Sequence, residues 1–245
     1  MNVTTKRKVV VTGATRGLGL AIASSLANED YHVIGVARKI SPEFLNLKGE
    51  KPELVDFMEC DFSDIAQIYI FSKRLYKQHG RVYGLINNAG VGVDGVLSTM
   101  HETDIARMIQ VNLHAPIVLT KYLSRGMLIN KSGRIINISS IIANTGFHGL
   151  SAYASTKAGL VGFTRSLSRE LGKVGITVNC VSPGFMTTEM TSALASEKLE
   201  SIRRRSPLSR FPTVDEVATA VSYLLSDSAS AITGIVLTVD TGSTA

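Results

Sequence analysis

Short apolar runs alternate with helix-length segments along the whole chain of 245 residues. The runs are rich in Val and Ile and are bounded by turn or capping residues, as is typical of strands in a parallel sheet. We expect seven strands, at 8–12, 32–37, 54–59, 82–87, 134–139, 176–182 and 235–240. The pattern predicts one domain over residues 1–245. Its expected fold class is α/β, a Rossmann-like doubly wound parallel seven-stranded sheet with helices on both faces.

Helices are expected between these strands, over about 17–28, 63–78, 102–124 and 151–172. Ser63 is the expected cap of the second helix, because a serine hydroxyl can accept from the free N–H groups there. Capping boxes at Thr99–Glu102 and Thr213–Glu216 predict two further helix starts. The segment 188–206 mixes apolar with polar residues, which fits an amphipathic lid over a substrate or a plain surface helix pair.

Composition narrows the class of protein. With 44% hydrophobic and 19% charged residues the chain can bury a substantial core. Cys60 and Cys180 form no CxxC and no cluster, so we expect reduced core residues, a cytoplasmic location and no metal site. No stretch reaches the ~20 apolar residues that span a bilayer, and the N-terminal apolar run is too short for a signal peptide. We therefore expect no membrane association.

The net charge of +6 and a pI near 9.4 favour anionic partners. The basic residues are scattered, and the one dense cluster, 203–205, is best interpreted as a solvated helix face. We therefore expect no nucleic acid partner. A phosphorylated cofactor or an acidic carrier fits the charge.

A glycine-rich turn joins the first strand to the first helix, in the sequence TGATRGLG. Glycines at this place let the backbone approach a pyrophosphate at the positive end of the helix. A tight turn without a ligand is the alternative. The expected contacts come from Gly13, Thr15, Arg16, Gly17, Leu18 and Gly19.

The second strand ends in Ala37-Arg38-Lys39, without an acidic residue. An NAD site places an acid here for the ribose 2′-hydroxyl, whereas a 2′-phosphate needs a cation. Arg38 and Arg16 supply such cations. The sequence therefore predicts NADP(H) as the cofactor.

Tyr153 and Lys157 stand one helical turn apart among small residues, in GLSAYASTKAG. One interpretation is an ordinary helix aromatic beside a solvated charge. In the other, the ammonium lowers the pKa of the phenol, normally about 10, so that it can transfer a proton. The pair alone does not decide between them.

Further elements accompany this pair in the chain. In order, the whole set is TGATRGLG, Asn87-Asn88-Ala89-Gly90, Asn112, Ser140, Tyr153 and Lys157. With this set the chain resembles the short-chain dehydrogenase/reductase family, from about residue 8 to 240, nearly its whole length.

The resemblance implies a role for each catalytic residue. Tyr153 would protonate a carbonyl oxygen as hydride arrives, and Lys157 would hold the nicotinamide ribose and lower the tyrosine pKa. Ser140 would hydrogen-bond the substrate oxygen; its neighbour Ser139 competes for this role, and the family's spacing to the tyrosine selects Ser140. Asn112 would hold a water that links Lys157 to solvent.

The resemblance also extends the cofactor site. Asp61 would meet the adenine, and the segment around Asn88, Ala89 and Gly90 would pack against the adenosine side and support the sheet. After the sixth strand, the family's motif brings Pro183, Gly184, the Met186 backbone and Thr188 to the nicotinamide carboxamide. A helix cap is an alternative and compatible role for Thr188.

Within the family, PLSRF and AITGIVLTVD look most like 3-oxoacyl-(acyl carrier protein) reductases. Three departures stand out. Ser209 and Thr241 occupy positions where the usual pattern, Pro-Leu-Gly-Arg and Asp-Gly-Gly, has glycine. In the loop before the tyrosine, apolar Phe147 and Leu150 stand where polar Asn and Gln are common. These two side chains favour a bulkier or more apolar acyl group.

The expected function is NADPH-dependent reduction of a 3-oxoacyl thioester on acyl carrier protein or CoA, within lipid metabolism. The alternatives are a dehydrogenase of another secondary alcohol (a sugar, a steroid or a cyclic alcohol) and a nucleotide-sensing regulatory protein. The family also implies a homotetramer, with the helices around 102–124 and 151–172 at one interface.

Overall fold

Seven parallel strands form one sheet in the computed structural model, which describes residues 6–187, 199–200 and 203–245. The order across the sheet is β3-β2-β1-β4-β5-β6-β7. This is the doubly wound Rossmann-like fold that the sequence predicted. The strands are β1 (Lys8–Thr12), β2 (His32–Ala37), β3 (Val55–Glu59), β4 (Gly84–Asn87), β5 (Gly133–Ile138), β6 (Ile176–Pro183) and β7 (Val236–Val239).

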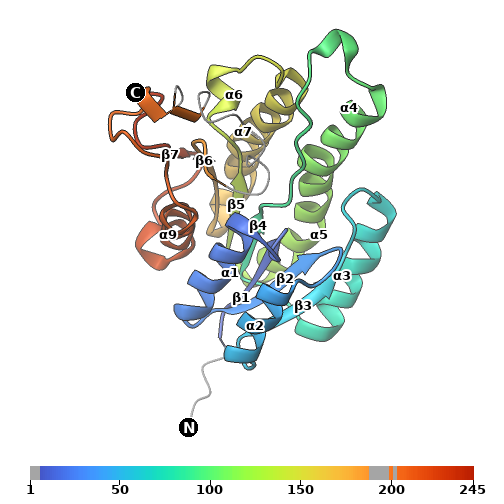
Figure 1. Cartoon of the computed structure of the whole chain (residues 1–245). Coiled ribbons are helices and arrows are strands. Elements are labelled where there is room, and N and C mark those ends of the chain that lie inside the picture. Colours follow the sequence, from blue (N-terminus) through green and yellow to red (C-terminus); the bar gives the residue numbers. More distant parts are fainter. Residues whose placement is uncertain (1–5, 188–198, 201–202) are drawn as a thin grey trace.

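The helices cover both faces of this sheet (Figure 1). One layer contains α1 (Gly17–Asn28), α2 (Pro42–Glu50) and α9 (Val214–Leu225). The other contains α3 (Ile65–His79), α4 (Glu102–Ile109), α5 (Ala115–Asn130) and α7 (Ser151–Leu171). The short helix α6 (Ile142–Thr145) and the start of α7 follow β5 at the carboxyl edge of the sheet.

Each face of the sheet has its own apolar core. Ile22 of α1 packs with Val221 of α9 on one face, and Phe71 of α3 packs with Leu119 of α5 on the other. Gly35 of β2 is needed for this packing, because a Cβ there would collide with the Phe44 ring of α2. Such close fitting fixes the helices over the strands, and thereby the loops at the strand ends.

Two predicted helix starts are wrong. Asp64, not Ser63, caps α3, since its carboxylate accepts from the Ala66 N–H at 2.9 Å. Ser63 instead donates to Asp61. The expected box at Thr99–Glu102 does not form, because the Thr99 hydroxyl donates to the Val96 carbonyl within a short 3₁₀ turn. Both cases show nearby polar groups competing for the same short side chains.

The second capping box is confirmed. The Thr213 hydroxyl accepts from the Glu216 N–H at 3.1 Å, and the Glu216 carboxylate accepts from the Thr213 N–H at 2.9 Å. The expected helix over 102–124 is α4 and α5 joined by a π-helical segment, Gln110–His114. Most of the segment 188–206, including Thr188, lies outside the described residues.

Other expectations from composition can be compared with the structure. Cys60 and Cys180 are both free and buried. Arg203 and Arg204 are exposed and pair with Glu200, as the solvated-face interpretation predicted. Among the described residues, no helix has the length and apolar character needed to cross a membrane.

Candidate active site

The glycine turn lies between β1 and α1 at the carboxyl edge of the sheet. The Gly13 N–H donates to the Val36 carbonyl at 2.7 Å, which ties the turn to β2. Gly13 and Gly17 have φ of +66° and +51°, conformations that favour glycine. A Cβ at Gly19 would collide with the Gly13 carbonyl. Gly13 and Gly19 therefore let the turn pack closely beside the α1 N-terminus, whose free N–H groups suit a phosphate group.

The residues after β4 hold this turn in place. The Asn88 side-chain amide donates to the Thr12 carbonyl at 2.9 Å and to the Gly13 carbonyl at 3.3 Å. The Thr12 hydroxyl in turn accepts from the N–H groups of Asn88 and Ala89, both at 3.0 Å. Asn88 and Ala89 thus tie the segment after β4 to the glycine turn. Thr12 was missed by the sequence analysis, although it stands directly before the first glycine.

Asn87 begins a buried chain of polar contacts beneath the site. Its amide donates to Asn137 Oδ1 of β5 at 2.8 Å, and the Asn137 amide donates to the Thr164 hydroxyl of α7 at 2.8 Å. These bonds link β4, β5 and α7 in the middle of the fold. They fix the position of α7 relative to the strands, and therefore the positions of Tyr153 and Lys157 on that helix.

The structure distinguishes the two serines after β5. Ser139 is buried, and its hydroxyl donates to the Lys157 carbonyl at 2.9 Å, inside the protein. The Ser140 hydroxyl accepts from the Ile142 N–H and faces the Tyr153 phenol at hydrogen-bonding range. Ser140 is therefore the serine beside the tyrosine, and its expected contact with a substrate oxygen stays a prediction.

Lys157 is buried beneath the site. Its Nζ donates to the Ile138 carbonyl at 2.8 Å and lies 5.6 Å from the centre of the Tyr153 ring. A Cβ at Gly90 would come within 3.5 Å of the same Nζ. The glycine thus leaves open space next to the ammonium. The family resemblance implies that a ribose hydroxyl binds this ammonium.

The expected lowering of the tyrosine pKa by lysine is not found in the chain itself. Burial raises the pKa of Tyr153 to about 12, outweighing the hydrogen bond with Ser140. Burial also lowers the pKa of Lys157 to about 8. Desolvation therefore dominates both groups and favours their neutral forms. The phenol of the unliganded chain holds its proton at neutral pH.

Asn112 lies in the π-helical segment and is fully buried. Its carboxamide accepts from the Val91 N–H and donates to the Val91 carbonyl, both at 2.8 Å, and it donates to the Thr156 hydroxyl at 3.2 Å. The side chain thus joins the loop after β4 to α7. These contacts give Asn112 a positioning role, and the water that the resemblance implied stays a prediction.

The expected cations lie at the carboxyl ends of β1 and β2. Arg16 directly precedes α1, Arg38 directly follows β2, and both are exposed. Asp61 follows β3 and accepts from the N–H and the hydroxyl of Ser63 at 2.9 and 2.8 Å. Burial opposes ionisation of Asp61, but the Ser63 bonds and the charge of Arg38 lower its pKa. Arg38 and Asp61 therefore lie near each other at the ends of β2 and β3, whereas Arg16 belongs to the glycine turn, between Thr15 and Leu18 in the chain.

The loop before α7 also lies at the carboxyl edge of the sheet. Phe147 is 36% exposed, and Leu150, just before α7, is partly buried. The Gly95 N–H donates to the Gly149 carbonyl at 3.0 Å, which joins this loop to the one after β4.

The segment after β6 was expected at the nicotinamide carboxamide. β6 ends at Pro183, and the Gly184 N–H donates to the Val239 carbonyl at 2.9 Å. Met186 packs against the core of the α1 face.

Comparison with known proteins agrees with this arrangement. Residues 13–244 match a family model described as Enoyl-(Acyl carrier protein) reductase. The chain is 38% identical to the 3-oxoacyl-(acyl carrier protein) reductase of Escherichia coli (strain K12) over 95% of both chains. It is 37% identical to the Vibrio cholerae enzyme of the same name, over 95% of both chains. The Staphylococcus aureus enzyme of that name is 35% identical, over 96% of this chain and 97% of its own.

The chain belongs to the short-chain dehydrogenase/reductase family. Members of this family are oxidoreductases that use a nicotinamide cofactor. The features of this chain that suit such a cofactor are the open glycine turn, the space at Gly90 and the buried Lys157.

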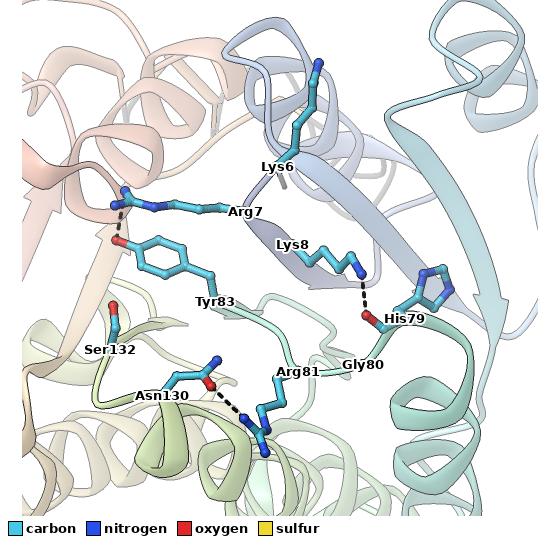
Figure 2. Close-up of a pocket in the computed structure, with 9 residues that line it drawn as sticks. All are labelled: Lys6, Arg7, Lys8, His79, Gly80, Arg81, Tyr83, Asn130 and Ser132. Atoms are coloured by element: carbon cyan, nitrogen blue, oxygen red, sulfur yellow. Dashed lines mark hydrogen bonds between the residues drawn. The ribbon is translucent and has the colours of Figure 1, made fainter. Parts of the chain in front are cut away.

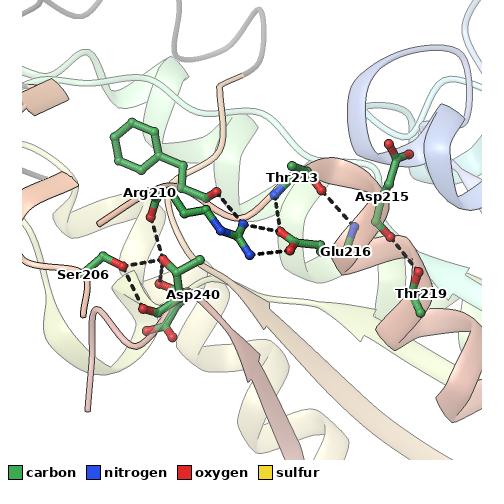
Figure 3. Close-up of polar contacts among 9 residues, drawn as sticks. Ser206, Arg210, Thr213, Asp215, Glu216, Thr219 and Asp240 are labelled. Carbon is green, nitrogen blue, oxygen red and sulfur yellow. Dashed lines mark hydrogen bonds and ion pairs between the residues drawn. The ribbon is translucent and has the colours of Figure 1, made fainter. Parts of the chain in front are cut away.

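This short-chain reductase departs from the usual glycine pattern at two positions that lie close together. Ser209 and Thr241 have φ of +52° and +59°, in the left-handed region where glycine is favoured. The Thr241 hydroxyl donates to the Arg210 carbonyl at 2.8 Å, and the Ser206 hydroxyl donates to the Thr241 carbonyl at 2.7 Å. Arg210 in turn forms a two-bond ion pair with Glu216 of α9 (Figure 3).

A cavity of about 420 Å³ lies at the amino edge of the sheet, opposite the edge that carries the catalytic residues. Its walls come from the starts of β1, β4 and β5 and the ends of α3 and α5 that precede them (Figure 2): Lys6, Arg7, Lys8, His79, Gly80, Arg81, Tyr83, Asn130 and Ser132. Several of these cations are already engaged, since Arg7 bonds Asp227 and Arg81 bonds Asn130. The cavity is thus separate from the site of the family's chemistry.

Proposed function

We propose that this protein reduces 3-oxoacyl thioesters to 3-hydroxyacyl thioesters with NADPH as the hydride donor. The observation that carries the proposal is the Ser140–Tyr153–Lys157 arrangement at the end of β5, in a chain 38% identical to a reductase of that name. Acyl carrier protein is the proposed carrier of the substrate, and its acidic character suits a chain of net charge +6.

When bound, the reduced nicotinamide supplies the hydride to the carbonyl carbon. The neutral Tyr153 phenol gives its proton to the carbonyl oxygen, which completes the alcohol. Ser140 offers the same oxygen a second hydrogen bond, so the charge that develops there meets two donors. Lys157 holds the ribose through its ammonium, which Ile138 positions from below. Asn112, Val91 and Thr156 fix the loop and the helix that present these groups.

Reduction of a carbonyl is here weighed against reduction of a carbon–carbon double bond, because the family model's description names an enoyl reductase and the relatives are named 3-oxoacyl reductases. Reduction at a carbonyl needs donors at the oxygen, and the pairing of Ser140 with Tyr153 supplies two. This favours the 3-oxoacyl thioester over the 2-enoyl thioester.

The test is a steady-state assay of NADPH consumption with 3-oxoacyl and 2-enoyl thioesters on acyl carrier protein and on CoA. A panel of sugar, steroid and cyclic ketones is included. We expect kcat/KM for the 3-oxoacyl thioester to exceed that for the other classes by about a hundredfold or more. Faster turnover of a ketone or enoyl thioester would replace the proposal. Nucleotide binding without turnover of any substrate would favour a nucleotide-sensing protein.

A further inference from the structure

Two histidines and an aspartate meet at the amino edge of the sheet, far from the catalytic residues. His32 opens β2, Asp56 is the second residue of β3, and His79 ends α3. His32 Nε2 lies 3.0 Å from Asp56 Oδ2, and His79 Nδ1 lies 3.9 Å from the same oxygen. The sequence predicted no metal ligands, because these residues are 24 and 23 positions apart and form no spacing motif.

The donor set suits a divalent transition metal. Two imidazole nitrogens and one carboxylate oxygen are the ligands that zinc, nickel and copper accept readily. In a tetrahedral zinc site these ligand atoms stand about 3.4 Å apart. Here all three lie within 4.8 Å of one another, so small side-chain rotations suffice to bring them to a common ion. We propose that His32, Asp56 and His79 form a zinc-binding site.

The backbone holds the three ligands in place. β2 and β3 pair in parallel with Ile34 opposite Asp56, which fixes two of the ligands on neighbouring strands. The Lys8 ammonium donates to the His79 carbonyl and so fastens the end of α3 to β1. Figure 2 shows the His79 ring at the margin of the cavity, on the side away from Arg7 and Tyr83. The geometry therefore exists without the ion, and binding needs little ordering of the chain.

Access and coordination are also suitable. The three side chains are partly exposed, at 21% for His32, 35% for Asp56 and 13% for His79. An ion can therefore enter from solvent, and a water can fill the fourth position. The remaining carboxylate oxygen, Asp56 Oδ1, is held by Lys48 at 3.3 Å, which orients the carboxylate.

The ordinary alternative is an ion-paired cluster in which His32 and Lys48 share Asp56 without a metal. A substitution of Lys48 distinguishes the zinc site from the ion-paired cluster. The Lys48 ammonium repels a divalent cation, so Lys48→Met should strengthen zinc binding by about tenfold. In the ion-paired cluster the same change only removes one partner of Asp56 and confers no affinity for zinc.

The test uses the full, tag-free chain after removal of metals with a chelator. Titration calorimetry with zinc should give one equivalent bound, and cobalt(II) should give a visible absorption band of tetrahedral type. Zinc at about 100-fold above its Kd should raise Tm by about 5 °C or more. NADPH-dependent turnover should stay within about twofold, because the catalytic residues lie at the other edge of the sheet.

His32→Gln and His79→Gln should each abolish the cobalt band and the zinc-dependent rise in Tm. His101→Gln, which removes an exposed histidine before α4, should keep both. Circular dichroism of each variant checks that it folds, and Asp56→Asn serves if one histidine variant does not. Zinc binding that survives all three changes, or no binding by the intact chain, would overturn the proposal.

Discussion

Lys157 Nζ donates to the Ile138 carbonyl at 2.8 Å, so a buried cation of α7 is held by the last residue of β5. This bond places the ammonium beneath the Tyr153 ring, where a nicotinamide ribose would lie. Burial makes the arrangement costly, because it lowers the pKa of Lys157 to about 8 from the ordinary 10.5.

Lys157→Met should therefore stabilise the fold while removing activity. Below pH 8 the charged lysine is disfavoured in the folded state by about 3 kcal/mol, from a difference of 2.5 pKa units. The variant also loses the hydrogen bond to the Ile138 carbonyl, which reduces the gain in stability by about 1 kcal/mol. We expect a net gain of about 1–3 kcal/mol in the free energy of unfolding at pH 7. Urea unfolding measures it.

The pH dependence of this gain has a definite sign. The folded pKa lies below the unfolded one, so the unfolded chain binds more protons between pH 8 and 10.5. Wild-type stability should rise across this window relative to Lys157→Met, and the two curves should approach one another near pH 10.5. Parallel curves from pH 7 to 10.5 would show that Lys157 is not desolvated.

Tyr153→Phe removes the proton donor and keeps the ring. Turnover should fall by at least about a hundredfold, the lower range for a general acid, with NADPH affinity retained. Stopped-flow or steady-state assays together with fluorescence titration of NADPH separate the two quantities. Tyr69→Phe, at an exposed position of α3, is the matched control and should leave both unchanged. Near wild-type turnover in the Tyr153 variant would assign the proton transfer elsewhere.

Cofactor choice should depend on the cations beside the glycine turn. Two guanidinium contacts to a 2′-phosphate, at about 1.5–3 kcal/mol each, should favour NADPH over NADH by about a hundredfold or more. Ala37→Asp with Arg38→Ala places a carboxylate near the ribose and removes one cation, so the preference should be lost or reversed. The measurement is kcat/KM with both cofactors in both proteins. A preference of the wild-type protein for NADH would by itself refute NADP(H) as the cofactor.

Substrate range should respond to the loop before α7. Phe147→Asn with Leu150→Gln should shift preference from bulky apolar acyl groups toward short ones by about tenfold to a hundredfold. The reason is that burying one apolar side chain contributes about 1.5–3 kcal/mol. The readout is the ranking of kcat/KM along a series of acyl chain lengths. His148→Gln, between the two on the same loop, is the control. An unchanged ranking in the double variant would place these side chains outside the substrate path.

Backbone strain at Ser209 offers a stability prediction. A serine at φ of +52° is strained, and Ser209→Gly should raise the free energy of unfolding by about 0.5–1 kcal/mol. Thr241→Gly relieves similar strain but loses the hydroxyl contacts with Ser206 and Arg210, so no gain is expected there. Denaturant midpoints compare the two. A larger gain at Thr241 than at Ser209 would contradict this reading of the contacts.

The fold was predictable because its signals are local and repeated. Alternating apolar runs located all seven strands, and the turn at Gly13 located the cofactor edge. Helix starts were less predictable, since Asp64 and Ser63 are equally good caps by residue type. Only the folded structure shows that the Ser63 hydroxyl donates to Asp61 and that Asp64 caps α3. The choice of Ser140 over Ser139 came from the family's spacing to the tyrosine, and in the structure the Ser140 hydroxyl faces Tyr153 whereas the Ser139 hydroxyl donates to the Lys157 carbonyl.

Other features needed three-dimensional proximity. The raised pKa of Tyr153 depends on how deeply α7 is buried, which the spacing of Tyr153 and Lys157 does not reveal. The partners of Asn112 come from two distant segments, at Val91 and Thr156. The meeting of His32, Asp56 and His79 depends on the order of strands, so no run of sequence contains it.

The π-helical segment Gln110–His114 sets the rotational phase between α4 and α5. A π turn holds one residue more than an α turn, and each residue of an α-helix advances the chain by about 100°. Deleting one residue here would give a continuous regular helix in which one half is rotated by that angle against the other. Either Asn112 would turn away from Val91, or buried Leu119 would leave the core. The chain should therefore tolerate a one-residue change of length far less here than in the turn at Lys131, where α5 ends.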